Sequence, residues 1–131
     1  MTLDFLKRPL FWGLAILLSG LSQSYAQNAF PAFRHFSVED GMPSTEVYSM
    51  MQDCHKNLWF ATDRGICKYN GYDFKTYAYK EGLTDNTVFY LQEDTKGRIW
   101  AYTFSGRMFY LENEKFVAYK YNDLLVAETQ S

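Results

Sequence analysis

Short hydrophobic and aromatic runs alternate with polar, turn-forming stretches along most of the chain after residue 35. The runs are rich in Val, Ile, Phe, Tyr, Trp and Thr, which fit a pleated sheet, and Gly, Asn, Asp or Lys residues separate them. Asn70-Gly71 is a tight-turn pair, because both residues tolerate a positive φ. The pattern predicts eight strands, at about residues 47–52, 58–62, 65–69, 73–77, 87–93, 99–103, 107–111 and 115–119.

The eight predicted strands form two copies of one unit. The copies match at an offset of 41 residues, and the offset becomes 42 at Phe74 with Phe116 and at Tyr77 with Tyr119, so one extra residue is expected after Tyr110. The units span about residues 36–77 and 78–119, and a third copy is predicted to begin in residues 120–131. The pairs matched at the shorter offset include Gly41 with Gly82, Val47 with Val88, Asp53 with Asp94, Trp59 with Trp100, Thr62 with Thr103, Gly65 with Gly106 and Tyr69 with Tyr110.

Four strands in about 41 residues is the size of one β-propeller blade. A blade has two apolar faces that it cannot bury alone, so neighbouring blades must cover them. We therefore predict an all-β fold in which residues 27–131 form an incomplete propeller of four-stranded antiparallel blades. The alternative is a β-sandwich with an accidental duplication, which the repeated spacing of Asp, Trp, Thr and Gly disfavours. As an isolated polypeptide, residues 27–131 are expected to be marginally stable or aggregation-prone.

The first 26 residues differ from the rest. Lys7 and Arg8 precede an apolar run at residues 10–18, and Ser24-Tyr25-Ala26 places small residues at the two positions that a signal peptidase reads. This layout predicts a secretory signal peptide at residues 1–26 and an exported domain after it. The alternative is an uncleaved N-terminal anchor, although the apolar run is short for a membrane span.

Composition narrows the function classes. The net charge is -2 and no basic block occurs, so nucleic-acid binding has little support. An exported protein can form disulfides, but the only two cysteines, Cys54 and Cys67, are too few to indicate a disulfide framework. The favoured interpretation is an unpaired turn residue at Cys54 and a small buried strand residue at Cys67.

The residues with possible chemistry mostly have a structural explanation. Trp59, Trp100 and Tyr72 are weak candidates for stacking on a sugar, but a tryptophan repeated at equivalent blade positions favours packing between blades. Asp53 and Asp94, like Thr62 and Thr103, are equivalent turn residues, which favours capping of the turns over acid–base work.

No catalytic, cofactor or metal site is predicted. His35 and His55 are the only histidines, and Cys54-His55 lacks a second ligand pair at suitable spacing. The sequence contains no nucleophile triad order, phosphate-binding glycine loop or zinc motif. The chain by itself is therefore not expected to be an enzyme.

The combined pattern resembles the two-component regulator propeller repeat. The residues that carry the resemblance are Asp40-Gly41-Met42-Pro43-Ser44, Leu58-Trp59-Phe60-Ala61-Thr62, Gly65-Ile66 and Tyr69-Asn70-Gly71, with Glu81-Gly82-Leu83, Glu93-Asp94, Gly97-Arg98-Ile99-Trp100 and Thr103 in the second unit. There are two departures: Lys56 stands where the second unit has Gly97, so that turn must differ or accept strain, and the 104–107 turn is less regular than its counterpart.

The resemblance implies a role in signal transduction. Proteins of this family carry many such repeats in the periplasm, before a membrane span and a histidine kinase, and often sense polysaccharide breakdown products. The resemblance therefore implies an N-terminal fragment of a two-component sensor, with further blades, an oligosaccharide ligand and a homodimeric receptor as expected partners. The alternative is a stand-alone secreted propeller for glycan binding, adhesion or glycan processing.

Overall fold

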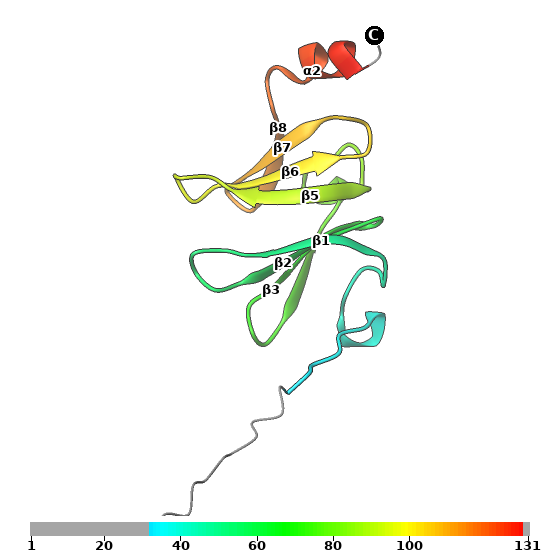
Figure 1. Ribbon diagram of the computed structural model, residues 1–131, viewed down its shortest axis with the longest axis vertical. Helices are drawn as coiled ribbons and strands as arrows, with labels where there is room; N and C mark the ends of the chain where they lie inside the picture. The colour runs from blue at the N-terminus through cyan, green and yellow to red at the C-terminus, as the bar shows by residue number, and fades with distance from the viewer. Residues whose placement is uncertain (1–31, 130–131) are drawn as a thin grey trace, which may run out of the picture. The chain divides into compact units, whose positions relative to one another are not determined.

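The computed structural model describes residues 32–129, which form two four-stranded antiparallel sheets and a C-terminal helix (Figure 1). The predicted signal peptide lies outside the described residues. The strands agree with the sequence prediction to within one residue at each end. They are β1 (Val47–Gln52), β2 (Leu58–Thr62), β3 (Gly65–Tyr69), β4 (Phe74–Tyr77), β5 (Val88–Glu93), β6 (Ile99–Thr103), β7 (Met108–Glu112) and β8 (Lys115–Ala118), followed by helix α2 (Asn122–Thr129).

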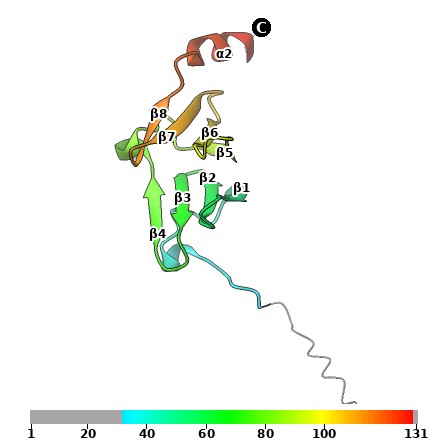
Figure 2. The same cartoon turned by 90° about the vertical axis from the view of Figure 1, so that its left-hand side faces the viewer.

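Each sheet is one repeat unit whose strands pair in chain order, β1-β2-β3-β4 and β5-β6-β7-β8. The two sheets stack with their strands in the same order, so that β1 lies next to β5, as Figure 2 shows. This arrangement confirms the predicted blade-like repeats. We call the two sheets the first and second blade.

The main hydrophobic core lies between the two blades. Trp59, Ala61, Ile66 and Tyr77 of the first blade join seven buried residues of the second. The Tyr77 ring stacks on Trp59, with centroids 5.7 Å apart, and contacts Phe116 edge-on at 5.5 Å. Burying this many large side chains supplies most of the stabilisation that either sheet gains. The second-blade members are Leu83, Val88, Leu91, Ile99, Ala101, Phe109 and Phe116.

In each unit, residues that come before the blade in the chain cover part of one blade face, the face opposite the one on which a following blade would pack. Phe36 contacts Phe74 edge-on at 5.3 Å in front of the first blade, as Tyr77 contacts Phe116 in front of the second. Met42 is buried in the same cluster as Phe36, and this cluster fills the face of the first blade that points away from the second. Packing between a unit and the residues before it is therefore repeated along the chain.

The far face of the second blade has no covering sheet among residues 32–129. Trp59 is 1% exposed because the second blade covers it, whereas its counterpart Trp100 is only half-buried. Trp100 lies beside Tyr110 at 5.2 Å and Tyr119 at 5.5 Å, with the Arg98 guanidinium over its ring. We call this surface the open face; it is aromatic, unlike the polar outer face of a closed sandwich.

Within the first blade, Asp53 holds the β1–β2 turn closed. Its carboxylate accepts hydrogen bonds from the backbone N–H groups of His55 (2.9 Å) and Asn57 (2.8 Å), from the Asn57 side chain and from Trp59 Nε1 (2.8 Å). The turn thereby also fixes the indole that packs between the blades. This confirms the capping role that the sequence favoured for Asp53.

Asp94 repeats the arrangement in the second blade. It accepts from the backbone of Lys96 and Arg98, from Arg98 Nε (2.8 Å) and from Trp100 Nε1 (2.9 Å). The bonds from Trp100 and Arg98 hold the pKa of Asp94 well below its usual range. For Asp53, burial opposes ionisation, but the bonds from Trp59, Asn57 and His55 outweigh it and lower its pKa.

Two departures noted in the sequence are explained by backbone geometry. Lys56 adopts φ 66°, close to the 76° of Gly97, so the first turn keeps the geometry and accepts a left-handed lysine. The extra residue of the second unit lies in the β6–β7 turn. In the first blade Thr62 pairs with Gly65, three residues on, whereas the amide of the equivalent Thr103 donates to the carbonyl of Arg107, four residues on. The sequence alignment, which put this residue after Tyr110, was wrong. By strand register, Tyr110 is equivalent to Lys68.

The segment predicted to begin a third repeat forms helix α2. The first two units open with a short 3₁₀ turn that ends at Gly41 (φ 111°) or Gly82 (φ 99°), and a side chain at Gly82 would collide with the Phe116 carbonyl. Leu124 at the equivalent place cannot adopt this conformation readily, and the chain continues as a helix. That a third blade follows stays a prediction.

Polar contacts also join the blades. Glu114, at the tip of the β7–β8 hairpin, accepts hydrogen bonds from Lys75 and from the Tyr77 hydroxyl (2.8 Å) on the first blade. Glu93 accepts one from the Cys54 amide at 2.9 Å.

Cys54 and Cys67 are free, the former exposed and the latter buried, as the favoured interpretation expected. Among the described residues, no helix is long and apolar enough to cross a membrane.

Replacing Asp53 or Asp94 with Asn tests the turn. Asn presents an N–H group where the indole donor points, so Asp53→Asn is expected to cost about 1–3 kcal/mol of unfolding free energy. Asp94→Asn, at a more exposed site, is expected to cost less. The measurement is urea unfolding followed by tryptophan fluorescence.

The lowered pKa values of Asp53 and Asp94 predict that the unfolding free energy depends on pH, and the same two variants test this. Because the folded-state pKa of both aspartates is lowered, their stabilisation is present above the unfolded carboxyl pKa of about 4 and is lost as the pH falls below it. The unfolding free energy of each Asn variant should therefore change less between pH 6 and pH 3 than that of the unaltered chain. Equal slopes for all three would contradict the assignment.

Candidate functional site

The first strand of each blade contains a bulge that leaves one residue without a cross-strand partner. In β1, Val47 pairs with Thr62 and Ser49 with Ala61, so Tyr48 is unpaired; in β5, the same shift leaves Phe89 unpaired. A bulge re-aims a side chain out of the regular alternation. Tyr48 (45% exposed) and Phe89 (42% exposed) contact each other edge-on, with centroids 4.9 Å apart.

Phe104 extends this aromatic pair into a row of three. It is presented by the longer β6–β7 turn, is 72% exposed and lies 5.6 Å from Phe89. Its backbone N–H donates to the Thr87 carbonyl at 2.8 Å, which ties the turn to the start of β5. None of the three aromatic residues belongs to either buried cluster.

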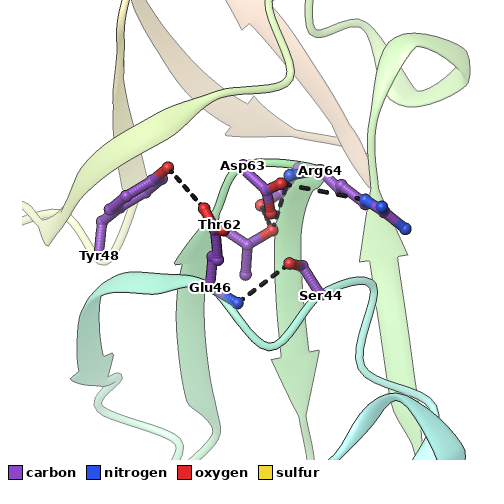
Figure 3. Close-up of polar contacts among 7 residues, drawn as sticks. Ser44, Glu46, Tyr48, Thr62, Asp63 and Arg64 are labelled. Atoms are coloured by element: carbon purple, nitrogen blue, oxygen red, sulfur yellow. Dashed lines mark hydrogen bonds and ion pairs between the residues drawn. The ribbon is translucent and has the colours of Figure 1, made fainter.

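Polar side chains lie near Tyr48 in the first blade (Figure 3). The Tyr48 hydroxyl donates to Glu46 Oε2 at 3.3 Å, and Asp63 and Arg64 follow β2 in the adjoining turn. Thr62 braces that turn, because its hydroxyl donates to the Gly65 carbonyl (2.7 Å) and accepts from the Arg64 amide (3.1 Å). We define the rim cluster as Glu46, Tyr48, Asp63, Arg64, Phe89 and Phe104.

The rim cluster contains two carboxylates, Glu46 and Asp63, and one cation, Arg64. The Arg64 Nε lies 3.9 Å from Asp63 Oδ2 and the Arg64 side chain is 71% exposed, so this ion pair is weak. Asp63 Oδ1 is sheltered and has no hydrogen-bond partner among the described residues. Partial desolvation of the Tyr48 hydroxyl raises the pKa of Tyr48, and so do its hydrogen bond to Glu46 and the charges of Glu46 and Asp63.

Two side chains next to the rim cluster, Ser44 and Asp85, accept hydrogen bonds from backbone amides. The Ser44 hydroxyl accepts from the Glu46 amide at 3.0 Å, and Asp85 does the same for Thr87 at the equivalent place in the second blade. Asp85 uses its second oxygen for the Ser105 amide at 2.9 Å. Asp85 therefore anchors the strand entry and the β6–β7 turn.

The structure separates the residues that the sequence singled out. Trp59 is buried between the blades, as the packing interpretation expected, and has no free face for a sugar. Trp100 lies on the open face. Tyr72 is 89% exposed on the outer β3–β4 hairpin, where Asn70 Oδ1 accepts from its amide. In that turn only Gly71 has a positive φ, so Asn70 acts through its side chain.

The remaining candidates form no site. Thr62 and Thr103 brace their turns, as expected. The exposed Cys54 lies 3.2 Å from His55 Nδ1, and its pKa is raised, chiefly by a hydrogen bond to Glu93. Within residues 32–129, no group of three or more His, Cys, Asp or Glu side chains is placed to hold a metal ion.

The rim cluster was not predicted from the sequence, although the sequence contains a signal for it. Several positions that build each blade hold the same residue in both units, such as Asp53 and Asp94. At the rim, Glu46 is matched by Thr87 and Tyr48 by Phe89. An exposed position that differs between the repeats is not needed to build the blade, so a surface specific to one blade can form there.

No family model matches the chain, and no curated protein does. Solved structures do match. The extracellular domain of BT3049 from B. thetaiotaomicron, described as a hybrid two component system, has a TM-score of 0.60 and 28% identity over 68% of this chain. The extracellular domain of BT4673 from the same organism, described as a one component system, has a TM-score of 0.55 and 21% identity over 66% of this chain.

The chain resembles the extracellular sensor domains of two-component systems. This confirms the expected resemblance and the propeller-type fold. The chain spans 13% and 12% of the two matched chains, so it corresponds to a small part of a long propeller protein. The rim cluster supplies this part with aromatic faces and hydrogen-bond acceptors, which are means of binding a ligand.

The contact between Glu46 and Tyr48 can be tested by titration. Glu46→Gln removes the charge nearest the phenol, so the pKa of Tyr48 should move down toward its ordinary value. The measurement is an NMR titration of ¹³Cζ-labelled tyrosine, with Tyr48→Phe identifying the signal. Glu39→Gln, an exposed carboxylate elsewhere, is the control and should leave the titration unchanged; an equal shift in both variants would contradict the contact.

Proposed function

We propose that this chain contributes two blades to the exported ligand-sensing propeller of a two-component receptor, whose histidine kinase lies elsewhere in the polypeptide. The open face of the second blade is the observation that carries the proposal. Trp100 and Tyr119 there are equivalent to Trp59 and Tyr77, which the next blade buries in the first unit. The small share of the matched sensor chains that this chain covers points the same way.

The ligand of such a receptor is an oligosaccharide, and the propeller lies in the periplasm. The signal-peptide pattern at residues 1–26 supports export, and the extracellular location of the matched domains agrees with it. The chain's part in this function is binding. Its two blades supply a scaffold and a surface, and the receptor's output requires domains outside residues 32–129.

The open face makes a polypeptide of residues 27–131 prone to self-association. Tyr110→Lys places a lysine where the first blade carries the equivalent Lys68, so the strand tolerates it while the aromatic face becomes charged. This variant should be more monomeric by size-exclusion chromatography with light scattering. Tyr72→Lys, on the outer hairpin, is the matched control and should not change the association state. A cooperative, monomeric unfolding transition of the unaltered polypeptide would overturn this expectation.

The signalling role is tested on the full-length protein in membrane vesicles. Partial hydrolysates of xylan, mannan and arabinan are added, and transfer of labelled phosphate from ATP to histidine is measured. We expect one hydrolysate to change the phosphorylation rate, and deletion of residues 36–119 to abolish the response. Release of shorter sugars without any phosphorylation would instead support the stand-alone, glycan-processing alternative.

A further inference from the structure

We propose that the rim cluster binds the sugar units of an oligosaccharide that carries no negative charge. This inference rests on the proposed sensing function and adds to it a place and a selectivity. Three features carry it, and each is a local irregularity in an otherwise regular repeat.

The first feature is the geometry that presents the aromatic rings. Tyr48 and Phe89 are the residues that the two bulges leave unpaired, and Phe104 sits on the turn that is lengthened in the second blade. A regular strand would have turned these side chains toward a blade face, where the next sheet would bury them. Both kinds of irregularity direct aromatic side chains to the same surface, and bulges commonly re-aim a side chain in this way next to active sites.

The second feature is the exposure of the rings next to hydrogen-bonding groups. Phe104 is 72% exposed, and the Tyr48 hydroxyl lies against Glu46 and near Asp63. Flat aromatic faces bordered by carboxylate oxygens suit a ligand with an apolar ring face and hydroxyl donors around its edge. A purely apolar partner would leave these carboxylates desolvated and unpaired.

The third feature is charge. Glu46 and Asp63 outnumber Arg64, and the guanidinium is already close to Asp63. A carboxylated or sulfated sugar would meet net repulsion, whereas the hydroxyls of a neutral sugar would donate hydrogen bonds to the exposed Glu46 carboxylate. The open face differs from the rim cluster, because two cations, Arg98 and Lys120, lie there beside aromatic rings.

The test uses the full-length protein and defined probes: neutral xylo-, manno- and arabino-oligosaccharides and oligogalacturonate, with binding measured by titration calorimetry. Tyr48→Ala and Phe104→Ser should each weaken binding of the neutral ligand by about tenfold. Tyr72→Ala removes a more exposed tyrosine outside the rim and should leave the affinity unchanged. The circular dichroism melting temperature of each variant verifies that it is folded.

A second measurement does not depend on losing binding. Glu46→Gln removes one rim charge, so the affinity for oligogalacturonate relative to the neutral ligand should rise by about fivefold. The control Glu39→Gln should not change this ratio. A rise in both variants, or in neither, would overturn the charge argument.

The outcomes separate this inference from the proposed function. A neutral ligand that binds the unaltered protein and both rim variants equally leaves the sensor standing and removes the rim site. No sugar binding by the unaltered protein removes the oligosaccharide ligand itself. If Tyr48→Ala and Phe104→Ser abolish self-association of the protein and no sugar binds, the rim is a contact between two copies, and the sugar site is refuted.

Discussion

The structure depends on the burial of each sheet's two apolar faces by its neighbours. Trp59, Ala61 and Tyr77 are almost inaccessible because the second blade packs over them, and the second blade in turn buries Phe109 and Phe116 against the first. Four strands form too small a sheet to enclose such side chains alone. The fold therefore has no stable unit smaller than a stack, and its stability resides at the blade-to-blade interfaces.

Polar groups complete the stack at its edges. Asp53 and Asp94 each accept hydrogen bonds from the amides of a hairpin turn and from the indole of the tryptophan six residues further on. One carboxylate therefore stabilises the turn and also orients the tryptophan. Glu93 and Glu114 then cross from the second blade to donors on the first. Lys75 and its charge hold the pKa of Glu114 below its ordinary value, with help from the Tyr77 hydroxyl. These bonds fix the register of one blade on the next, which apolar contact alone leaves loosely defined.

The sequence predicted the regular parts of this fold and not the irregular ones. Strand bounds and the capping roles of Asp53 and Asp94 followed from alternation and repeat spacing, because these features are local and occur twice. The position of the extra residue did not, because the Gly106 match hid a lengthened turn that only the pairing of Thr103 with Arg107 reveals. Helix α2 likewise follows from one missing glycine, and a single copy gives no second example to compare. The rim cluster depends on bulges, which leave no trace in hydrophobic alternation.

The unpaired residue of each bulge has a consequence for how such a protein can change. Because Tyr48 and Phe89 have no cross-strand partner and belong to neither buried cluster, either can be exchanged without disturbing the strand pairing or the buried core. Every added blade of this type brings one more such position to the same side of the stack. The architecture thus separates the residues that assemble the sheets from the residues that form this surface, and the surface can be altered one unit at a time while the sheets stay as they are.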